Sequence, residues 1–206
     1  MNQIIKIKPI NDVFSISWIM HIRCNYECMY CPPSRHNNTD PLPTLEELQA
    51  YWQQIFDKTQ HLKKPYKLSI SGGEPTINKN VLPFIQYLRT QFNDHVVHIN
   101  FITNGSASKQ YYLKLCPLVD SLSFSTHTEF MELGKFLENI QACSEFMTAN
   151  NKSCHVNIMD EFWAQDNVQI VSKFCQSNKI NHSVSPIDYS FQTRSYPLIK
   201  HDKTTV

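Results

Sequence analysis

Residues 24–31 read Cys24-Asn25-Tyr26-Glu27-Cys28-Met29-Tyr30-Cys31, with three residues between the first two thiols and two residues between the second and third. These short spacings let one loop wrap a cube of iron and sulfide, and the loop follows a strand-like run over residues 14–22. A [4Fe-4S] cluster takes four protein ligands. Because this loop offers three, one iron is left free to bind a substrate.

A second motif, Ser71-Gly72-Gly73-Glu74-Pro75, follows about 40 residues later, at the end of another strand-like run. Glycine permits close approach of the backbone to a ligand, and the proline biases the preceding glutamate toward an extended conformation. Together the two motifs resemble the radical S-adenosylmethionine (radical SAM) superfamily, whose first three cysteines have this spacing and whose second strand ends in a Gly-Gly-Glu-Pro turn. The resemblance covers about residues 14 to 186.

Strand-like and helix-like patterns alternate along the chain. Strands are expected at 14–22, 66–71, 96–103, 120–125, 153–159 and 180–185. Helices are expected at 44–58, 80–92, 108–115, 129–149 and 166–177, with a capping box at Thr44 and Glu47 and an N-cap at Asp166. The alternation implies a parallel sheet with right-handed crossovers. The resemblance implies an α/β fold, a partial parallel (βα)6 barrel with one open side. We predict a core domain over residues 1–186, including a short extension over 1–13, and a tail over 187–206.

Small polar side chains alternate with large apolar ones inside the predicted strands. The runs Ser121-Leu122-Ser123-Phe124-Ser125 and Lys67-Leu68-Ser69-Ile70-Ser71 show this pattern. Strands that are buried on both faces usually read as continuous apolar runs. In a curved parallel sheet, the apolar set would meet the helices and the polar set would face inward, which suits a polar ligand. The alternative is the solvated face of an antiparallel sheet, and the long intervening helices argue against it.

The resemblance implies roles for residues of both motifs. The three cysteines would hold the cluster, and the backbone of Tyr30 would help to position adenine. Gly72 and Gly73 would let main-chain groups approach S-adenosylmethionine, and the carboxylate of Glu74, held extended by Pro75, would accept its cationic amine. The other expected contacts with S-adenosylmethionine are Asn104, Ser125, His127 and Asn157.

Several of these residues also have an ordinary structural interpretation. Tyr30 is otherwise a packing aromatic, and Glu74 is otherwise a solvated loop carboxylate. Asn104 would instead make an Asx turn, Ser125 would fill space, and Asn157 would be a satisfied interior amide.

The later strand ends leave further alternatives open. His127 is expected on an exposed loop, where it either helps catalysis or caps the next helix. Residues 34–38, in the loop after the cysteines, would either touch substrate or form an ordinary solvated loop. The Gly-x-Ile-x-Gly-x-x-Glu pattern that is frequent in the superfamily is absent around strands five and six, so the ribose and adenine contacts stay open.

The resemblance also implies the reaction. S-Adenosylmethionine would chelate the open iron through its amine and carboxylate, and one electron would break its carbon–sulfur bond to give methionine and a 5′-deoxyadenosyl radical. That radical takes hydrogen from an unassigned substrate, which the open barrel would allow to be large. A flavodoxin or ferredoxin is the expected electron donor. Narrower alternatives are a glycyl-radical-enzyme activase and an enzyme similar to viperin, which modifies nucleotides and shares the Cys-Asn-Tyr start of its motif.

Two alternatives lie outside these enzymes: a zinc site, or an iron–sulfur binding module without turnover. Structural zinc wants four closed ligands, and the fourth would be His21 or His36. The glycine-rich strand ends would then go unexplained. The other four cysteines are scattered singly and are expected to be buried core thiols rather than a second cluster. They are Cys116, Cys143, Cys154 and Cys175.

Composition bounds the class of protein. The 206 residues suffice for one well-cored domain, and a formal net charge of +1 gives no general case for a nucleic-acid or lipid partner. The first residues lack the apolar stretch of a signal peptide, and no run approaches the roughly 20 apolar residues that span a bilayer. An odd count of seven cysteines fits a reducing compartment. We therefore expect a cytoplasmic protein.

Overall fold

A computed structural model of the chain describes residues 12–191. Six strands form one parallel sheet in the order β1-β2-β3-β4-β5-β6. The strands are β1 (Phe14–Ile19), β2 (Tyr66–Ser71), β3 (Val96–Thr103), β4 (Ser121–Ser125), β5 (Ser153–Asp160) and β6 (Asn181–Pro186). The α-helices are α1 (Leu45–Thr59), α2 (Val81–Gln91), α3 (Lys109–Leu115), α4 (Leu133–Ala149) and α5 (Gln165–Ser177). The predicted partial (βα)6 barrel is confirmed.

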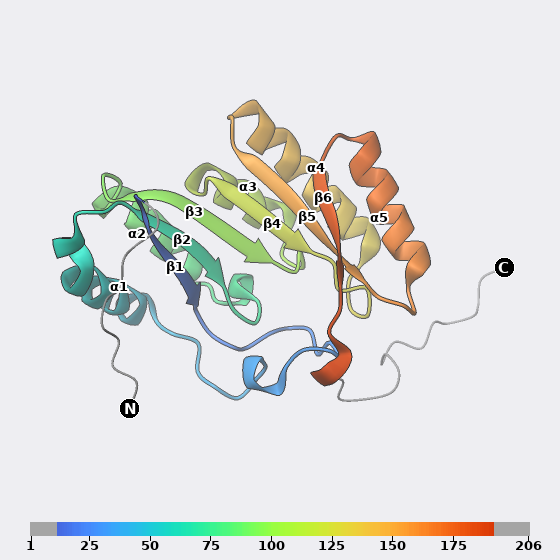
Figure 1. Ribbon diagram of the computed structural model, residues 1–206, viewed down its shortest axis with the longest axis horizontal. Helices are drawn as coiled ribbons and strands as arrows, with labels where there is room; N and C mark the ends of the chain where they lie inside the picture. The colour runs from blue at the N-terminus through green and yellow to red at the C-terminus, as the bar shows by residue number, and fades with distance from the viewer. Residues whose placement is uncertain (1–11, 192–206) are drawn as a thin grey trace.

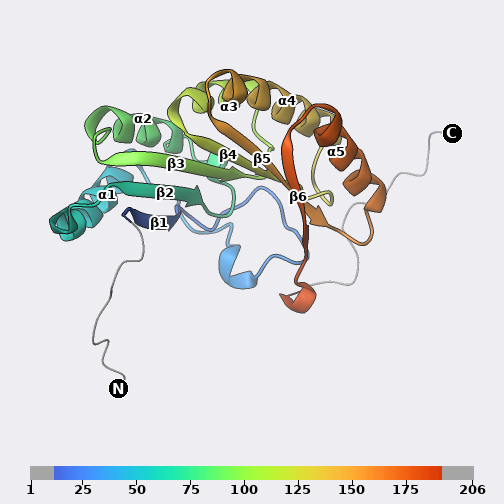
Figure 2. The same ribbon diagram turned by 45° about the horizontal axis from the view of Figure 1, so that its top comes forward.

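The sheet is curved, and its two faces have different coverings. Figure 2 shows α2, α3, α4 and α5 arching over the outer face, while the segment between β1 and α1 passes beneath the inner face. Figure 1 shows β1 and β6 at opposite edges of the sheet, so the barrel is open between them. The space between the outer face and the helices is filled by the main apolar core, with fully buried rings such as Phe84, Phe101 and Phe124.

The alternation of polar and apolar residues follows the two faces of the sheet, as predicted. Leu68, Ile70, Leu122 and Phe124 are buried in the core under the helices. The intervening polar residues are half-buried on the opposite face, where they bond to one another across strands. Asn100, for example, donates to Ser69 Oγ at 3.2 Å and accepts from Ser121 Oγ at 2.9 Å. Parallel pairing places these small polar groups in rows, and the inner face is therefore polar.

Local chemistry explains most element boundaries. The predicted capping box starts α1, because Thr44 Oγ1 accepts from Glu47 N at 3.2 Å and Glu47 Oε2 accepts from Thr44 N at 2.8 Å. Two predicted helix starts are wrong. Helix α4 begins at Leu133 rather than residue 129, because residues 127–131 form a turn whose amides bond back to the His127 carbonyl. Helix α5 begins at Gln165, so Asp166 lies in the first turn and is not the N-cap.

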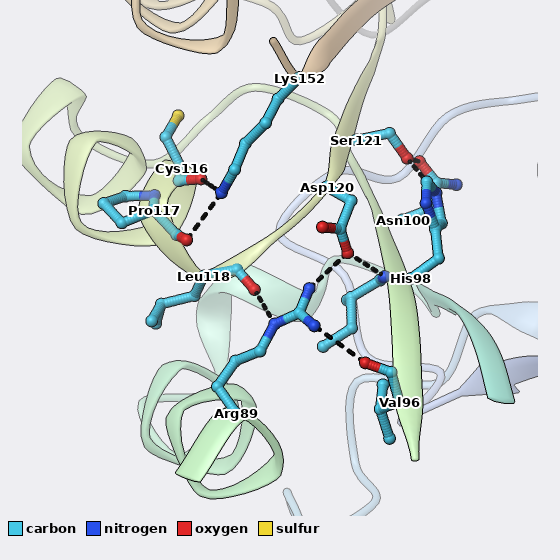
Figure 3. A network of polar contacts seen from close by, with 11 residues as sticks. Arg89, Val96, His98, Asn100, Cys116, Pro117, Leu118, Asp120, Ser121 and Lys152 are labelled. Carbon is cyan, nitrogen blue, oxygen red and sulfur yellow. Dashed lines mark hydrogen bonds and ion pairs between the residues drawn. The ribbon is translucent and has the colours of Figure 1, made fainter. Parts of the chain in front are cut away.

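A polar network ties the amino ends of β3 and β4 to the end of α2 (Figure 3). The Arg89 guanidinium pairs with the Asp120 carboxylate and donates to the carbonyls of Leu118 at 2.7 Å and Val96 at 3.0 Å. Asp120 in turn accepts from the amide of Ile99 at 2.7 Å. These contacts join the starts of two strands to the end of a helix, so this end of the sheet is a structural joint.

Candidate functional site

A cavity of about 250 Å³ lies at the carboxyl ends of the first four strands. This is the end of a parallel α/β sheet where ligands bind, because the loops that follow each strand converge there. Its lining residues are Cys24, Tyr26, Cys28, Tyr30, Cys31, Pro32, Arg35, Ser71, Gly72, Gly73, Glu74, Ile102, Thr103, Asn104, Ser125 and His127. The cavity thus brings both predicted motifs together.

The cysteine loop is packed down rather than projecting into solvent. Cys28 is buried, and Cys24 and Cys31 are half-buried. Burial raises the pKa of all three thiols, that of Cys24 to about 11. Each thiol is therefore protonated at neutral pH in the metal-free protein, and a bound metal would displace the protons.

Two glycines at the end of β2 are required by the close passage of the chain that leads into this loop. A Cβ on Gly73 would overlap the Arg23 carbonyl, and a Cβ on Gly72 would lie 2.5 Å from the His21 carbonyl oxygen. The same approach allows Gly73 N to donate to His21 O, and Glu74 N to donate to Arg23 O, each at 2.9 Å. The glycine pair thus positions the cysteine loop as well as lining the cavity.

Glu74 is fully buried, so its interpretation as a solvated loop carboxylate is wrong. Its carboxylate accepts from Thr76 N at 3.0 Å, Thr103 Oγ1 at 2.8 Å and Asn104 N at 2.6 Å. Burial raises the pKa of Glu74, and these hydrogen bonds oppose that rise. The side chain therefore joins the ends of β2 and β3 at the wall of the cavity.

Tyr30 and His127, which also line the cavity, form a hydrogen-bonded pair. Tyr30 Oη lies 2.7 Å from His127 Nδ1 and donates to Glu161 Oε1 at 2.8 Å. The Tyr30 and His127 rings are stacked, with centroids 5.9 Å apart. Burial lowers the pKa of His127 to about 4, so its imidazole is neutral at pH 7. The ring is half-buried, and its side chain caps no helix, since the N-cap of α4 is Glu132.

Within residues 12–191, no three histidine, cysteine or acidic side chains are grouped so that they would hold one metal ion. A zinc ion needs its ligands at about 2.0–2.3 Å, whereas a [4Fe-4S] cube binds each thiolate through a different iron. His21 and His36, the candidate fourth zinc ligands, are absent from the cavity lining. The zinc site as predicted, with His21 or His36 as the fourth ligand, therefore has no support in the cavity lining.

Comparison with known proteins agrees with this geometry. Residues 17–145 match the family model of the 4Fe-4S single cluster domain. The chain is 29% identical over 122 residues to GTP 3′,8-cyclase of Desulforamulus reducens, covering 55% of this chain and 36% of that protein. It is 33% identical over 84 residues to a probable GTP 3′,8-cyclase of Methanocaldococcus jannaschii, covering 40% of this chain and 26% of that protein. The chain belongs to the 4Fe-4S single cluster domain family, within the radical SAM superfamily.

The fold is also that of a solved radical SAM structure. Streptococcus suis SuiB bound to S-adenosylmethionine superimposes with a TM-score of 0.63 at 17% identity, over 89% of this chain and 44% of that chain. The chain therefore covers less than half of the length of each of these relatives, and only about a quarter of one of them. The cofactors are those of the superfamily, a [4Fe-4S] cluster and S-adenosylmethionine. Among the helices within residues 12–191, none has both the length and the apolarity needed to cross a bilayer.

The remaining predicted contacts of this radical SAM protein divide into two groups. Asn104 makes the Asx turn, accepting from Ser106 N at 3.0 Å, and it also donates to Asn25 Oδ1 at 3.0 Å in the cysteine loop. Ser125 lines the cavity. Pro75 is buried and starts the short helix η3 (Pro75–Ile77), and Asn157 bonds to Ser185 of β6; neither lines the cavity.

Two acidic residues that hold the cysteine loop escape detection in the sequence. Glu129 Oε2 accepts from Met29 N at 3.1 Å, and Glu161 accepts from the Tyr30 hydroxyl. Both carboxylates are buried, and each follows a strand near its carboxyl end. That position after a predicted strand was the only signal, because neither residue belongs to a short motif.

The scattered cysteines are core residues, as predicted. Cys116, Cys143, Cys154 and Cys175 are free and buried in the main core, away from the cavity. Ile187 and Tyr189, from the start of the predicted tail, pack against the cysteine loop. The extension over 1–11 and the tail beyond 191 lie outside the described residues.

Proposed function

We propose that this chain is a radical SAM enzyme in which Cys24, Cys28 and Cys31 hold the cluster and S-adenosylmethionine occupies the cavity beside them. The observation that carries the proposal is the composition of the cavity wall, where the three thiols and the Gly72-Gly73-Glu74 turn line one cavity and, among residues 12–191, no fourth cysteine lines it. A cluster held there keeps one iron without a protein thiolate. That vacancy is what the chelating amine and carboxylate of S-adenosylmethionine require.

The two cofactors supply the chemistry when bound: one electron from a flavodoxin- or ferredoxin-type donor cleaves the sulfonium, and the resulting 5′-deoxyadenosyl radical takes a hydrogen atom from a substrate. The chain supplies binding and orientation. A carboxylate offers about four lone-pair positions, and three donors of the chain use Glu74. One position therefore remains for the cationic amine. The rings of Tyr26 and Tyr30 line the cavity, where they would shield bound cofactors from water.

The substrate reaches this chemistry from the open side of the barrel. Of the loop residues 34–38, Arg35 lines the cavity and is the contact that we propose for a substrate or cofactor anion. The glycyl-radical-enzyme activase and the viperin-like enzyme are narrower versions of this proposal, and no side chain of the cavity favours one over the other. We also propose a cytoplasmic location and a single core domain that ends near residue 186.

Anaerobic reconstitution with iron and sulfide tests the proposal. The full chain should become brown, contain about four irons per chain, and form 5′-deoxyadenosine and methionine from S-adenosylmethionine when dithionite is added. Cys28→Ala should lose colour, iron and cleavage together. Cys175→Ala removes a thiol of α5 from the main apolar core and is the matched control. This variant should retain colour, iron and cleavage. A colourless zinc protein, or a brown one that never cleaves S-adenosylmethionine, would refute the enzyme.

A further inference from the structure

Three side chains from three different loops form a continuous hydrogen-bonded chain beside the cavity. Glu161 follows β5, Tyr30 belongs to the cysteine loop, and His127 follows β4. The Tyr30 hydroxyl is the middle member, 2.8 Å from Glu161 Oε1 and 2.7 Å from His127 Nδ1. Glu161 is fully buried, and both of its oxygens also accept from Thr128 N, each at 3.0 Å. The position of Tyr30 Oη is therefore closely defined.

The direction of these two hydrogen bonds follows from the number of hydrogens that the Tyr30 hydroxyl carries. A tyrosine hydroxyl carries one hydrogen, and Tyr30 donates it to the Glu161 carboxylate, whose Oε1 lies 2.8 Å away. An ionised carboxylate only accepts, so the hydroxyl donates away from His127. The contact with His127 then requires the imidazole to donate through Nδ1–H. A neutral imidazole that carries its proton on Nδ1 has a lone pair on Nε2.

The hydrogen bonds of the described residues use Nδ1 and leave the other ring nitrogen, Nε2, available. His127 lines the cavity, and its Nε2 has no hydrogen-bond partner within residues 12–191. Stacking on Tyr30 and an edge contact with Tyr26, whose centroid lies 6.3 Å away, hold the plane of the ring. An acceptor that is fixed in both orientation and tautomer discriminates between ligand groups.

We infer that His127 Nε2 is a hydrogen-bond acceptor that binds an N–H or O–H donor in the cavity, and that Glu161 and Tyr30 are positioning residues that hold its tautomer. The donor is a hydroxyl or amino group, on either S-adenosylmethionine or the substrate. The identity of the ligand rests on the proposed function, whereas the tautomer does not. The two claims can therefore fail separately.

Nitrogen-15 NMR of the histidine side chains in the full chain at pH 8 tests the tautomer without any cofactor. That pH lies above the value of about 7 to which burial raises the pKa of Glu161. The signal that disappears in His127→Gln should show an Nδ1–H imidazole. Tyr30→Phe keeps the stacked ring but removes the hydroxyl, and should convert this signal to the Nε2–H form. The signal of His98, whose Nε2 lies 3.0 Å from Ser121 Oγ in another part of the inner face, should be unchanged. A wild-type His127 that carries its proton on Nε2 overturns the inference.

The source of the donor is decided by equilibrium dialysis of labelled S-adenosylmethionine against the cluster-loaded protein. If the donor lies on S-adenosylmethionine, His127→Ala should weaken binding by about tenfold, the size of one hydrogen bond. Glu161→Gln should weaken it less, with iron content retained. Unchanged affinity, together with the Nδ1–H tautomer, assigns the donor to the substrate and still supports the acceptor. A loss of iron in His127→Ala or Tyr30→Phe contradicts the inference, because these residues would then serve only to build the cysteine loop.

Discussion

Carboxylates at the two ends of the same sheet are stabilised in different ways. At the amino ends of β3 and β4, Asp120 pairs with the Arg89 guanidinium, which also satisfies two carbonyls (Figure 3). At the carboxyl ends, Glu74 and Glu161 are fully buried, and neither has an ion-pair partner within residues 12–191. Their charge is balanced only by amide and hydroxyl donors.

This difference separates a structural joint from a binding site. Burying a carboxylate without a cation is costly unless hydrogen bonds compensate for the lost water. The amino end avoids that cost with its own arginine, which pairs with Asp120. The carboxyl end bears the cost beside a cavity, where a cationic ligand would relieve it. S-Adenosylmethionine carries a sulfonium and an ammonium group, so its charge complements this end of the sheet.

Gly73→Ala should have the largest effect, and it should disrupt the structure only at the carboxyl ends of the strands. The new methyl group would overlap the backbone of Arg23, which has no flexible end to move aside. We expect a loss of about 3 kcal/mol or more in the free energy of unfolding, together with loss of bound iron. Denaturant titration and iron analysis measure both.

The matched control for that variant is Gly134→Ala in the first turn of α4. A Cβ at Gly134 meets nothing within 4 Å. This variant should be unchanged or more stable by about 0.5 kcal/mol, because alanine favours the helix. If both glycine variants have the same stability and iron content, the close passage of the backbone at Gly73 is not what holds the cysteine loop in place.

Arg89→Met should disrupt the polar network at the amino ends of β3 and β4 and leave the cavity intact. Asp120 would lose its cation and two carbonyls would lose a donor, for an expected cost of about 2 kcal/mol, moderated because the Asp120 side chain is 32% exposed. Bound iron should be unchanged. In the double variant Arg89→Met/Asp120→Asn, part of the stability should return, since no unpaired charge is left. Thermal unfolding of the single and double variants checks this.

An exposed ion pair provides the reference for that experiment. Lys109 pairs with Glu138 on the surface, where the two side chains are 38% and 58% exposed. Glu138→Gln should change the free energy of unfolding by less than about 0.5 kcal/mol. A cost as large as that of Arg89→Met would show that burial does not distinguish the two pairs.

Glu74→Gln should produce a smaller loss of stability but a specific loss of ligand. The amide nitrogen replaces one carboxylate oxygen, so its hydrogens oppose at least one of the three donors that now bind Glu74, and we expect about 1–2 kcal/mol of destabilisation. Weaker binding of S-adenosylmethionine should accompany it, because the negative charge is gone. Dialysis of the cluster-loaded variant measures the affinity, and wild-type affinity would show that Glu74 only joins the two strand ends.

Among the changes at the cavity, the smallest effect should be a pH dependence caused by His127. Burial lowers its pKa from 6.5 to about 4, so the unfolded chain binds a proton more readily than the folded one. Its contribution to stability is fully present above pH 6.5 and is lost as the pH falls toward 4. Between pH 7.5 and pH 5, the free energy of unfolding of the wild-type protein should therefore fall by about 1 kcal/mol on account of His127, allowing for its partly exposed ring. This part of the fall should be missing in His127→Gln.

The comparison for this titration is His98, which lies near the amino end of β3. Burial lowers its pKa as well, but the carboxylate of Asp120 opposes that shift. His98→Gln should therefore alter the acid sensitivity less than His127→Gln does. Thermal unfolding midpoints at the two pH values, measured for both variants, decide between them. Equal effects would mean that the environment of His127 is not special.

Local patterns predicted much of the fold. The bounds of β2 and β3 agree with the expected ranges, and the capping box at Thr44 starts α1. These features depend on neighbours within a few residues, which a single sequence displays. The start of α4 was wrong, because residues 127–131 instead form a turn whose residues hold Tyr30 and Met29 of the cysteine loop.

The sequence by itself determined the spacing of the three thiols, the glycine turn and the alternation that makes a parallel sheet, because each is encoded within one short segment. Only the tertiary structure decided which buried acids hold the cysteine loop. Glu129 lies 100 residues from Met29, and Glu161 lies 131 residues from Tyr30. Those contacts exist because parallel strands deliver their following loops to one edge of the sheet, and no local pattern states which side chains will meet there.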